Sequence, residues 1–145
     1  MKIFFDKIVC SEDGLSGVVS RVSSALKGKE YFVMWLDGPM GAGKSTFVRH
    51  FLWNLGLDPG IPVLSPTYSI MNEYEIDGKW FAHVDLYRSE KNFSLAELGV
   101  LDAKDYTGVF VEWPEIAGSS NLISPSHILR IRYEGELERS YSLEG

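Results

Sequence analysis

Cysteine is almost absent from this sequence of 145 residues, because Cys10 is the only one. No disulfide can therefore form within the chain, and a reducing compartment suits it. Basic residues are also in short supply, since 14 lysines and arginines stand against 20 aspartates and glutamates and leave a formal net charge of −6. A surface that is negative as a whole repels a phosphate backbone, so we do not expect the chain to hold nucleic acid by itself.

Long hydrophobic runs are missing as well. The run Tyr31–Leu36 falls far short of the roughly 20 apolar residues that a membrane-spanning helix needs. The chain reaches Asp6 after three apolar residues, too few for the apolar part of a signal peptide. We therefore expect a cytoplasmic protein that makes no contact with a membrane. Its length suits a single domain over residues 1–145.

The most informative stretch is Gly38–Thr46, which reads Gly-Pro-Met-Gly-Ala-Gly-Lys-Ser-Thr and matches the phosphate-binding pattern G-x-x-x-x-G-K-S/T. The hydrophobic run Tyr31–Leu36 before it predicts a buried strand, and the amphipathic segment after it, to Leu55, predicts a helix. Strand, glycine-rich loop and helix in this order are the context that the pattern requires. We therefore expect this loop to bind the phosphates of a nucleotide.

Each residue type in the loop has a physical reason. Glycines let successive backbone N–H groups turn toward a phosphate, and the start of the helix adds free N–H groups and the positive end of its dipole. Lys44 is expected to bridge the β- and γ-phosphates, and the Ser45 hydroxyl to bind Mg²⁺. The expected nucleotide-binding residues of the loop are Gly38, Met40, Gly41, Ala42, Gly43, Lys44, Ser45 and Thr46.

Two elements are predicted ahead of the loop. A short strand is expected at Lys2–Phe5, and Ser11 is a good N-cap for a helix that runs to Leu26. Apolar residues recur through this helix at helical spacing, so one of its faces should pack on a sheet. These residues are Leu15, Val18, Val19, Val22 and Leu26.

The second half of the chain predicts strands of both directions. Asp77-Gly78 joins two runs of β character, Tyr68–Ile76 and Lys79–Tyr87, and two residues leave room only for an antiparallel hairpin. A second hairpin is expected from residues 128–133 and 139–143. The sequence thus predicts an α/β, P-loop NTPase-like three-layer fold with a mixed β-sheet and an antiparallel hairpin.

Hydrolysis of a bound nucleotide needs an acid near Mg²⁺ and a group that positions water. Glu112 follows the short hydrophobic strand Val109–Val111, and the carboxyl end of such a strand is where ligands bind in open α/β sheets. Period-two alternation places His83, Asp85 and Tyr87 on one face of their strand. Asp85 is expected to bind Mg²⁺ through water or to orient the attacking water, whereas His83 is expected to be either a core residue or a support for a neighbouring side chain.

Two further residues are candidates for the site. Thr67, after Ser65-Pro66, stands where a hydroxyl that senses the γ-phosphate and Mg²⁺ would be placed. Trp113 directly follows Glu112 and is expected to pack on the nucleotide base, on a partner surface, or in the core.

Four blocks now stand in a fixed order along the chain: Gly38–Thr46, Ser65–Tyr68, His83–Arg88 and Glu112–Glu115. This combination resembles the TsaE family, the P-loop ATPases of bacterial tRNA threonylcarbamoyladenosine biosynthesis. The match runs from the first strand to about Glu115. That family usually carries a threonine where this chain has a serine at the second position after the last glycine, and either hydroxyl can bind Mg²⁺.

The resemblance implies an ATP hydrolase that uses ATP and Mg²⁺ and works with two partner proteins, TsaB and TsaD, and that meets tRNA only indirectly. TsaD is the transferase that modifies the adenosine beside the anticodon. Carried over by position, Lys44 and Ser45 hold phosphate and Mg²⁺. Thr67 is the switch residue, and Asp85 and Glu112 are the acids around the metal and the water.

Two other functions use the same loop. A small-molecule kinase would usually add an arginine-bearing lid, yet the chain has few arginines and forms a hairpin where such an insert would lie. A non-hydrolysing adaptor, whose shape depends on bound ATP, would not need Asp85 and Glu112. A guanine nucleotide is disfavoured because the chain lacks an Asn-Lys-x-Asp motif.

Overall fold

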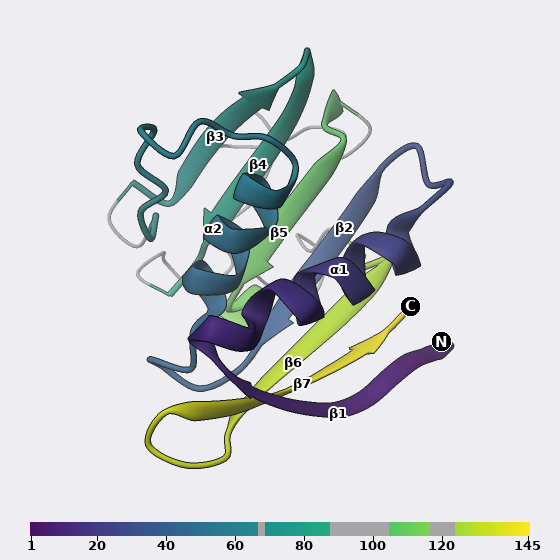
Figure 1. Ribbon diagram of the computed structural model, residues 1–145. Helices are drawn as coiled ribbons and strands as arrows, with labels where there is room; N and C mark the ends of the chain where they lie inside the picture. The colour runs from purple at the N-terminus through teal and green to yellow at the C-terminus, as the bar shows by residue number, and fades with distance from the viewer. Residues whose placement is uncertain (67–68, 88–104, 117–123) are drawn as a thin grey trace.

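A computed structural model describes residues 1–66, 69–87, 105–116 and 124–145 (Figure 1). These residues form a seven-stranded sheet in the order β1-β7-β6-β2-β5-β4-β3. Two α-helices, α1 (Leu15–Leu26) and α2 (Lys44–Asn54), accompany it, with 3-10 turns at Glu12–Gly14 and Pro114–Ile116. The strands are β1 (Ile3–Ser11), β2 (Phe32–Asp37), β3 (Met71–Ile76), β4 (Lys79–Asp85), β5 (Gly108–Glu112), β6 (His127–Tyr133) and β7 (Glu138–Glu144).

Four parallel strands form the middle of the sheet, with β2 between β5 and β6, and with β4 beside β5. The edges are antiparallel, because β3 pairs with β4, β7 with β6, and β1 with β7. The mixed sheet and both predicted hairpins are therefore confirmed. Since the carboxyl ends of parallel strands meet at one edge of a sheet, Asp37, Asp85 and Glu112 end up at the same edge.

Both helices lie side by side on one face of the sheet (Figure 1). Alternate residues of β2 point toward them, and Phe32, Met34 and Leu36 join a large apolar core with the helices. Phe110 of β5 packs edge-on against Phe32 and Phe51, with ring centroids 5.4 and 5.3 Å apart. The predicted stripe of α1 is confirmed, because all five of its apolar residues are buried.

The opposite face of the sheet carries a second apolar cluster, which includes Val33, Val84 and Val111. Among the described residues, both α-helices cover the first face, so these residues form two of the three layers that the sequence predicts. No helix in the described part of the chain is both long and apolar enough to cross a membrane.

Two predicted boundaries near the amino terminus are wrong. Ser11 makes no capping hydrogen bond, because a 3-10 turn follows it and α1 begins only at Leu15. The first strand extends past Phe5 to Ser11, since register shifts let the polar pair Asp6-Lys7 stay in an edge strand. Lys7 has a φ of 62°, as expected for an irregularity of this kind.

Gly108, the first residue of β5, is predicted to resist substitution. A Cβ atom there would lie 2.2 Å from the Phe32 ring, which is held by the core. Gly108→Ala should therefore lower the free energy of unfolding by about 2 kcal/mol or more. Gly17→Ala is the matched control, because it lies within α1 with nothing within 4 Å of its Cβ position and should raise that free energy by roughly 0.5–1 kcal/mol. Equal effects of the two changes in urea unfolding would contradict the prediction.

Candidate phosphate-binding and catalytic site

The loop between β2 and α2 has the conformation that its glycines allow. Gly41 and Gly43 have φ angles of 77° and 103°, and Gly43 is the N-cap of α2. Both angles lie in the left-handed region, which side chains with a Cβ avoid. Helix α2 then begins at Lys44, so its free N–H groups and positive dipole end face the loop. The described loop thus has the backbone conformation and the helix terminus that an anion site needs, and its binding of phosphate stays a prediction.

The hairpin of β6 and β7 holds this loop in place. The Tyr133 hydroxyl donates to the Met40 carbonyl at 2.9 Å, and Arg139 Nε donates to the Ala42 carbonyl at 3.2 Å. Arg132 Nη1 donates to the carbonyl of Asp37, just before the loop, at 2.7 Å. None of these three residues is predicted from the sequence. The available signal was the clustering of three of the scarce arginines within residues 130–139.

Lys44 is 5% exposed and has two partners. Its ammonium donates to the Gly38 carbonyl at 2.8 Å and lies 3.8 Å from the centre of the Trp113 ring. Burial lowers the pKa of Lys44, although the charges of Glu112, Asp85 and other carboxylates act to raise it. The lysine is therefore held by one carbonyl and one aromatic face at the mouth of the loop, where a phosphate would attract it.

Glu112, the last residue of β5, is 4% exposed and meets the loop directly. Its Oε2 atom accepts a hydrogen bond from the Ser45 hydroxyl at 2.7 Å and lies 2.5 Å from His83 Nε2. Burial acts to raise the pKa of Glu112, but its hydrogen bond with His83, attraction to His83, the Ser45 hydrogen bond and the Lys44 charge lower it overall. The side chain is thus a carboxylate at neutral pH.

His83 supports Glu112 from a fully buried position on β4. Its Nδ1 atom has no hydrogen-bond partner among the described residues, so Nε2 is the nitrogen that carries the proton toward Glu112. Of the two expectations for His83, core packing and support of a neighbour, the structure shows both, since the ring is fully buried and contacts Glu112.

Asp85 pairs in register with Glu112 across parallel strands β4 and β5. One of its carboxylate oxygens accepts the backbone N–H of Tyr87 at 2.9 Å, and the other lies 3.5 Å from the Ser65 hydroxyl. Asp85 is 3% exposed, whereas Tyr87 is 42% exposed. The face that is predicted to carry His83, Asp85 and Tyr87 is therefore buried at the first two residues and reaches the surface at Tyr87. The two acids therefore stand side by side at the edge of the sheet nearest the loop.

Lys44, Asp85 and Glu112 line a cavity of about 370 Å³. A second cavity of about 350 Å³ lies on the other side of Gly41, Gly43 and Thr46, and Leu137 and Arg139 line it. The residues around the first cavity are Met40, Gly41, Gly43, Lys44, Ser45, Thr46, Ser65, Asp85, Tyr87, Glu112 and Trp113.

Three residues of the predicted site blocks lie outside the described residues, namely Thr67, Tyr68 and Arg88. Of the others, Lys44, Ser45, Asp85, Glu112 and Trp113 meet around one cavity. The Trp113 ring lies against the Lys44 ammonium. Its centre is 5.0 Å from the centre of the Tyr87 ring. Its packing on a nucleotide base stays a prediction.

The oxygen donors at this cavity fit a hard cation such as Mg²⁺. Ser45 and Glu112 supply a hydroxyl and a carboxylate in contact, with Asp85 beside them. The described residues contain no group of three or more histidine, cysteine, aspartate or glutamate side chains that could hold a metal alone. Mg²⁺ in nucleotide sites typically takes one or two protein oxygens and completes its shell with phosphates and water.

The lowered pKa of Glu112 predicts a pH-dependent stability. A carboxyl whose pKa is lower in the folded state contributes stability above its unfolded value of 4.5 and loses it as the pH falls through the folded pKa. The free energy of unfolding of the wild type, relative to Glu112→Gln, should therefore decline as the pH falls below about 5, by roughly 1.4 kcal/mol for each unit by which the pKa is lowered. Urea unfolding without nucleotide or Mg²⁺ measures this.

The control is Glu75→Gln on β3, which removes one negative charge from an exposed site. A difference between wild type and Glu112→Gln that stays constant between about pH 3 and pH 7 would contradict the prediction.

A family model described as "Threonylcarbamoyl adenosine biosynthesis protein TsaE" matches residues 11–141. Among curated proteins, the tRNA threonylcarbamoyladenosine biosynthesis protein TsaE of Aquifex aeolicus is 38% identical over 88 residues, which cover 61% of this chain and 65% of that protein. The protein of the same name from Haemophilus influenzae is 34% identical over 91 residues, covering 62% of this chain and 56% of its own length. The matched segments thus span less than two thirds of these relatives.

Among solved structures, the crystal structure of Bacillus subtilus YdiB superposes with a TM-score of 0.70 at 22% sequence identity. The superposition covers 99% of this chain and 86% of that chain. At this identity the likeness concerns the fold, and it confirms the predicted α/β class.

Proposed function

Because this chain belongs to the TsaE family, we propose that it is a Mg²⁺-dependent ATP hydrolase that supports threonylcarbamoyl modification of tRNA together with TsaB and TsaD homologues. The relatives' names place them in threonylcarbamoyladenosine biosynthesis, and the proposal extends this role to the present chain. Its negative net charge favours a protein that leaves most contacts with tRNA to its partners.

The observation that carries the hydrolase proposal is the hydrogen bond of 2.7 Å between Ser45 and Glu112. It joins the hydroxyl of the phosphate loop to an acid from a different strand, as a nucleotide site with a metal requires. A loop that only held phosphate would not need a buried carboxylate beside it, because such a carboxylate repels the phosphates. The contact therefore favours a site that holds a metal together with the nucleotide, and the second acid beside it, Asp85, favours hydrolysis over passive binding.

The residues have the following proposed roles. The loop N–H groups and Lys44 bind the phosphates and stabilise the charge that develops on them. Ser45 and Glu112 would hold Mg²⁺, which would neutralise phosphate charge and orient the terminal phosphate. His83 keeps the Glu112 carboxylate in position through the buried contact to Oε2. Asp85 stands beside Glu112 and is the residue that orients the attacking water.

The nucleoside is proposed to lie over Thr46, in the cavity that Leu137 and Arg139 line. Trp113 does not line that cavity, so in this placement its ring meets Lys44 and not the nucleotide base. Lys44, Ser45 and Glu112 mark the end of the site for the terminal phosphates, so the rest of the nucleotide must leave the loop on its other side. This cavity shares Gly41, Gly43 and Thr46 with the first. Arg139 also braces the Ala42 carbonyl, so one residue would serve both the loop and the nucleoside pocket.

The deciding experiment measures phosphate release from MgATP by the purified chain, alone and with its TsaB and TsaD homologues. We expect release that needs Mg²⁺ and no added phosphate acceptor, and that rises when the partners are present. Binding of ATP with no release under either condition would instead favour the non-hydrolysing adaptor. A phosphorylated product formed from an added nucleoside would favour the kinase, and competition by GTP as strong as by ATP would remove the preference for adenine.

A further inference from the structure

The phosphate loop lies directly on β6, and two of its glycines are required by this contact. A Cβ atom on Gly38 would lie 2.7 Å from the Ile131 carbonyl oxygen. A Cβ atom on Gly41 would lie 2.8 Å from the Tyr133 hydroxyl oxygen, and Gly41 also has a φ of 77°. Glycine is the residue that permits so close an approach of another group to the backbone. The β6–β7 hairpin therefore restricts the loop independently of any phosphate.

The Tyr133 hydroxyl sets the direction of one peptide unit in this loop. A peptide unit is planar and trans, so its C=O and N–H bonds point in opposite directions. A donor that holds the carbonyl of one residue therefore also aims the N–H group of the next residue. Tyr133 donates to the Met40 carbonyl at 2.9 Å, so the Gly41 N–H points away from the hairpin.

Arg139 has the same effect on the peptide unit between Ala42 and Gly43. Its Nε atom donates to the Ala42 carbonyl at 3.2 Å, so the Gly43 N–H points away from Arg139. The guanidinium is itself held, because Nη1 donates to the Glu138 carbonyl at 2.9 Å and the group lies 4.3 Å from the centre of the Tyr133 ring. Tyr133 and Arg139 are paired residues of β6 and β7, so the two donors form one unit.

The two N–H groups that are aimed in this way are available to a ligand. Neither Gly41 nor Gly43 donates a backbone hydrogen bond to another described residue, whereas the Ala42 N–H between them donates to the Pro39 carbonyl at 3.1 Å. Both glycines line the first cavity, as Lys44 does. Backbone N–H groups in such a loop bind phosphate oxygens. The hairpin therefore holds the peptide units whose N–H groups a phosphate would meet.

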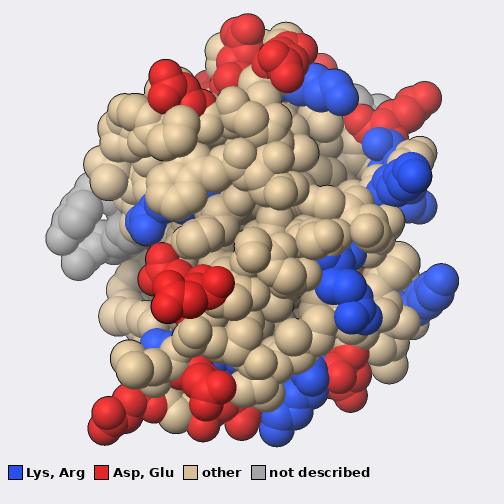
Figure 2. Space-filling model, viewed as in Figure 1, with Lys and Arg blue, Asp and Glu red and all other residues tan. Residues whose placement is uncertain are grey.

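The charge of Arg139 does not explain its place beside the loop. Three glutamates of the β6–β7 turn, Glu134, Glu136 and Glu138, stand just before it, and Lys7 pairs with the first of them. Figure 2 shows acidic side chains at the lower left of the face, where Figure 1 places this turn. The turn is net negative even when both cations are counted, so it does not attract a phosphate from a distance. What Arg139 supplies is a fixed direction for the carbonyl that it holds.

We propose that Tyr133 and Arg139 are positioning residues of the phosphate site, which aim the N–H groups of Gly41 and Gly43 at the phosphates of the nucleotide. The inference rests on the proposed function and adds to it two residues that lie 93 and 97 positions from the carbonyls they hold. Donors that are already aimed need no reorganisation when a phosphate binds. The hairpin thus contributes to nucleotide affinity through the loop, without touching the phosphates.

Tyr133→Phe tests the proposal, because it removes one hydroxyl and keeps the ring and the charge. Calorimetric titration of the full chain with a non-hydrolysable MgATP analogue should show affinity about threefold to tenfold below that of the wild type. Tyr106→Phe is the matched control, since its hydroxyl also donates over 2.9 Å, to Glu73 on β3, and should leave the affinity unchanged. Urea unfolding should show similar stability for the two variants, so a merely structural role would affect both affinities alike.

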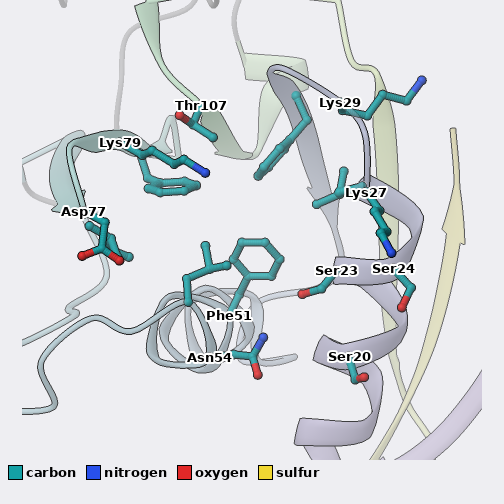
Figure 3. A pocket seen from close by; sticks show the side chains of 15 residues that line it. Ser20, Ser23, Ser24, Lys27, Lys29, Phe51, Asn54, Asp77, Lys79 and Thr107 are labelled. Atoms are coloured by element: carbon teal, nitrogen blue, oxygen red, sulfur yellow. The ribbon is translucent and has the colours of Figure 1, made fainter.

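Two-dimensional NMR of the chain without nucleotide separates the two donors. Tyr133→Phe should shift or broaden the amide signal of Gly41 more than that of Gly43. Arg139→Lys should have the opposite preference, because it keeps the charge but loses the planar fork that holds two carbonyls at once. The Thr107 amide should not move in either variant, since Thr107 lines a separate cavity of about 450 Å³ between the carboxyl-terminal ends of α1 and α2 (Figure 3).

The outcomes distinguish this proposal from the function on which it rests. A wild-type chain that does not bind the MgATP analogue would overturn both. A wild-type chain that binds the analogue, with equal affinity in Tyr133→Phe and Tyr106→Phe, would overturn the positioning role alone. Amide signals of Gly41 and Gly43 that match the wild type in both the Tyr133→Phe and Arg139→Lys variants would do the same.

Discussion

Lys44→Ala is expected to lower kcat/KM for MgATP hydrolysis by at least about 10³-fold and to weaken binding of the triphosphate. The ammonium is buried at the mouth of the loop, and among the described residues no other lysine or arginine lines the first cavity. In a site with little water, a charge aimed at the developing phosphate charge is worth several kcal/mol. Isotope-labelled phosphate release and calorimetric titration with an ATP analogue measure the two effects.

Lys44→Gln distinguishes charge from packing, because a glutamine amide can still donate a hydrogen bond in the direction of the Gly38 carbonyl. We expect it to be nearly as inactive as the alanine variant. Turnover by Lys44→Gln close to that of the wild type would mean that the positive charge is not needed. Circular dichroism and thermal unfolding of each variant confirm that the fold is retained.

Glu112→Gln is expected to reduce kcat by roughly 10²–10³-fold and to leave most nucleotide affinity intact. Glutamine has the shape of glutamate, so its carbonyl oxygen can still accept from Ser45 and His83. Only the negative charge that would hold Mg²⁺ disappears. The split between kcat and nucleotide affinity therefore tests the assigned role, because a purely structural role would change both together.

Ser45→Thr is the control for that substitution, since threonine keeps the hydroxyl that donates to Glu112. It should hydrolyse ATP at nearly the wild-type rate. Unchanged hydrolysis by Glu112→Gln, over a range of Mg²⁺ concentrations, would mean that another acid serves the metal, with Asp85 as the next candidate.

The sequence was sufficient to predict the parts of the fold that depend on local pattern. The strand and the helix around the glycine loop, the stripe of α1 and both hairpins follow from spacing and turn chemistry, and all are confirmed. The start of α1 was not predictable in this way, because Ser11 has the chemistry of a cap but the chain first makes a 3-10 turn. The length of β1 depends on its pairing with β7, which is far away in sequence.

The candidate site was likewise predictable only in part. Glu112 and Asp85 were recognisable because each ends a hydrophobic strand, and their pairing follows once the strands are parallel neighbours. The braces from Tyr133 and Arg139 were not recognisable, because they join the loop to a hairpin more than 90 positions away. Contacts of that kind arise from the order of strands in the sheet, which a single sequence does not specify.

The position of β1 at the edge of the sheet has a consequence for biosynthesis. Its only strand partner among the described residues is β7, so the strand of this sheet that is synthesised first pairs with the one that is synthesised last. Until β7 emerges, β1 has no place in the sheet and the phosphate loop lacks the braces from the β6–β7 hairpin. Pairing across such a sequence distance is slow and leaves strand edges exposed in the meantime. We therefore expect a nascent chain to acquire nucleotide affinity only after the whole sheet has been synthesised.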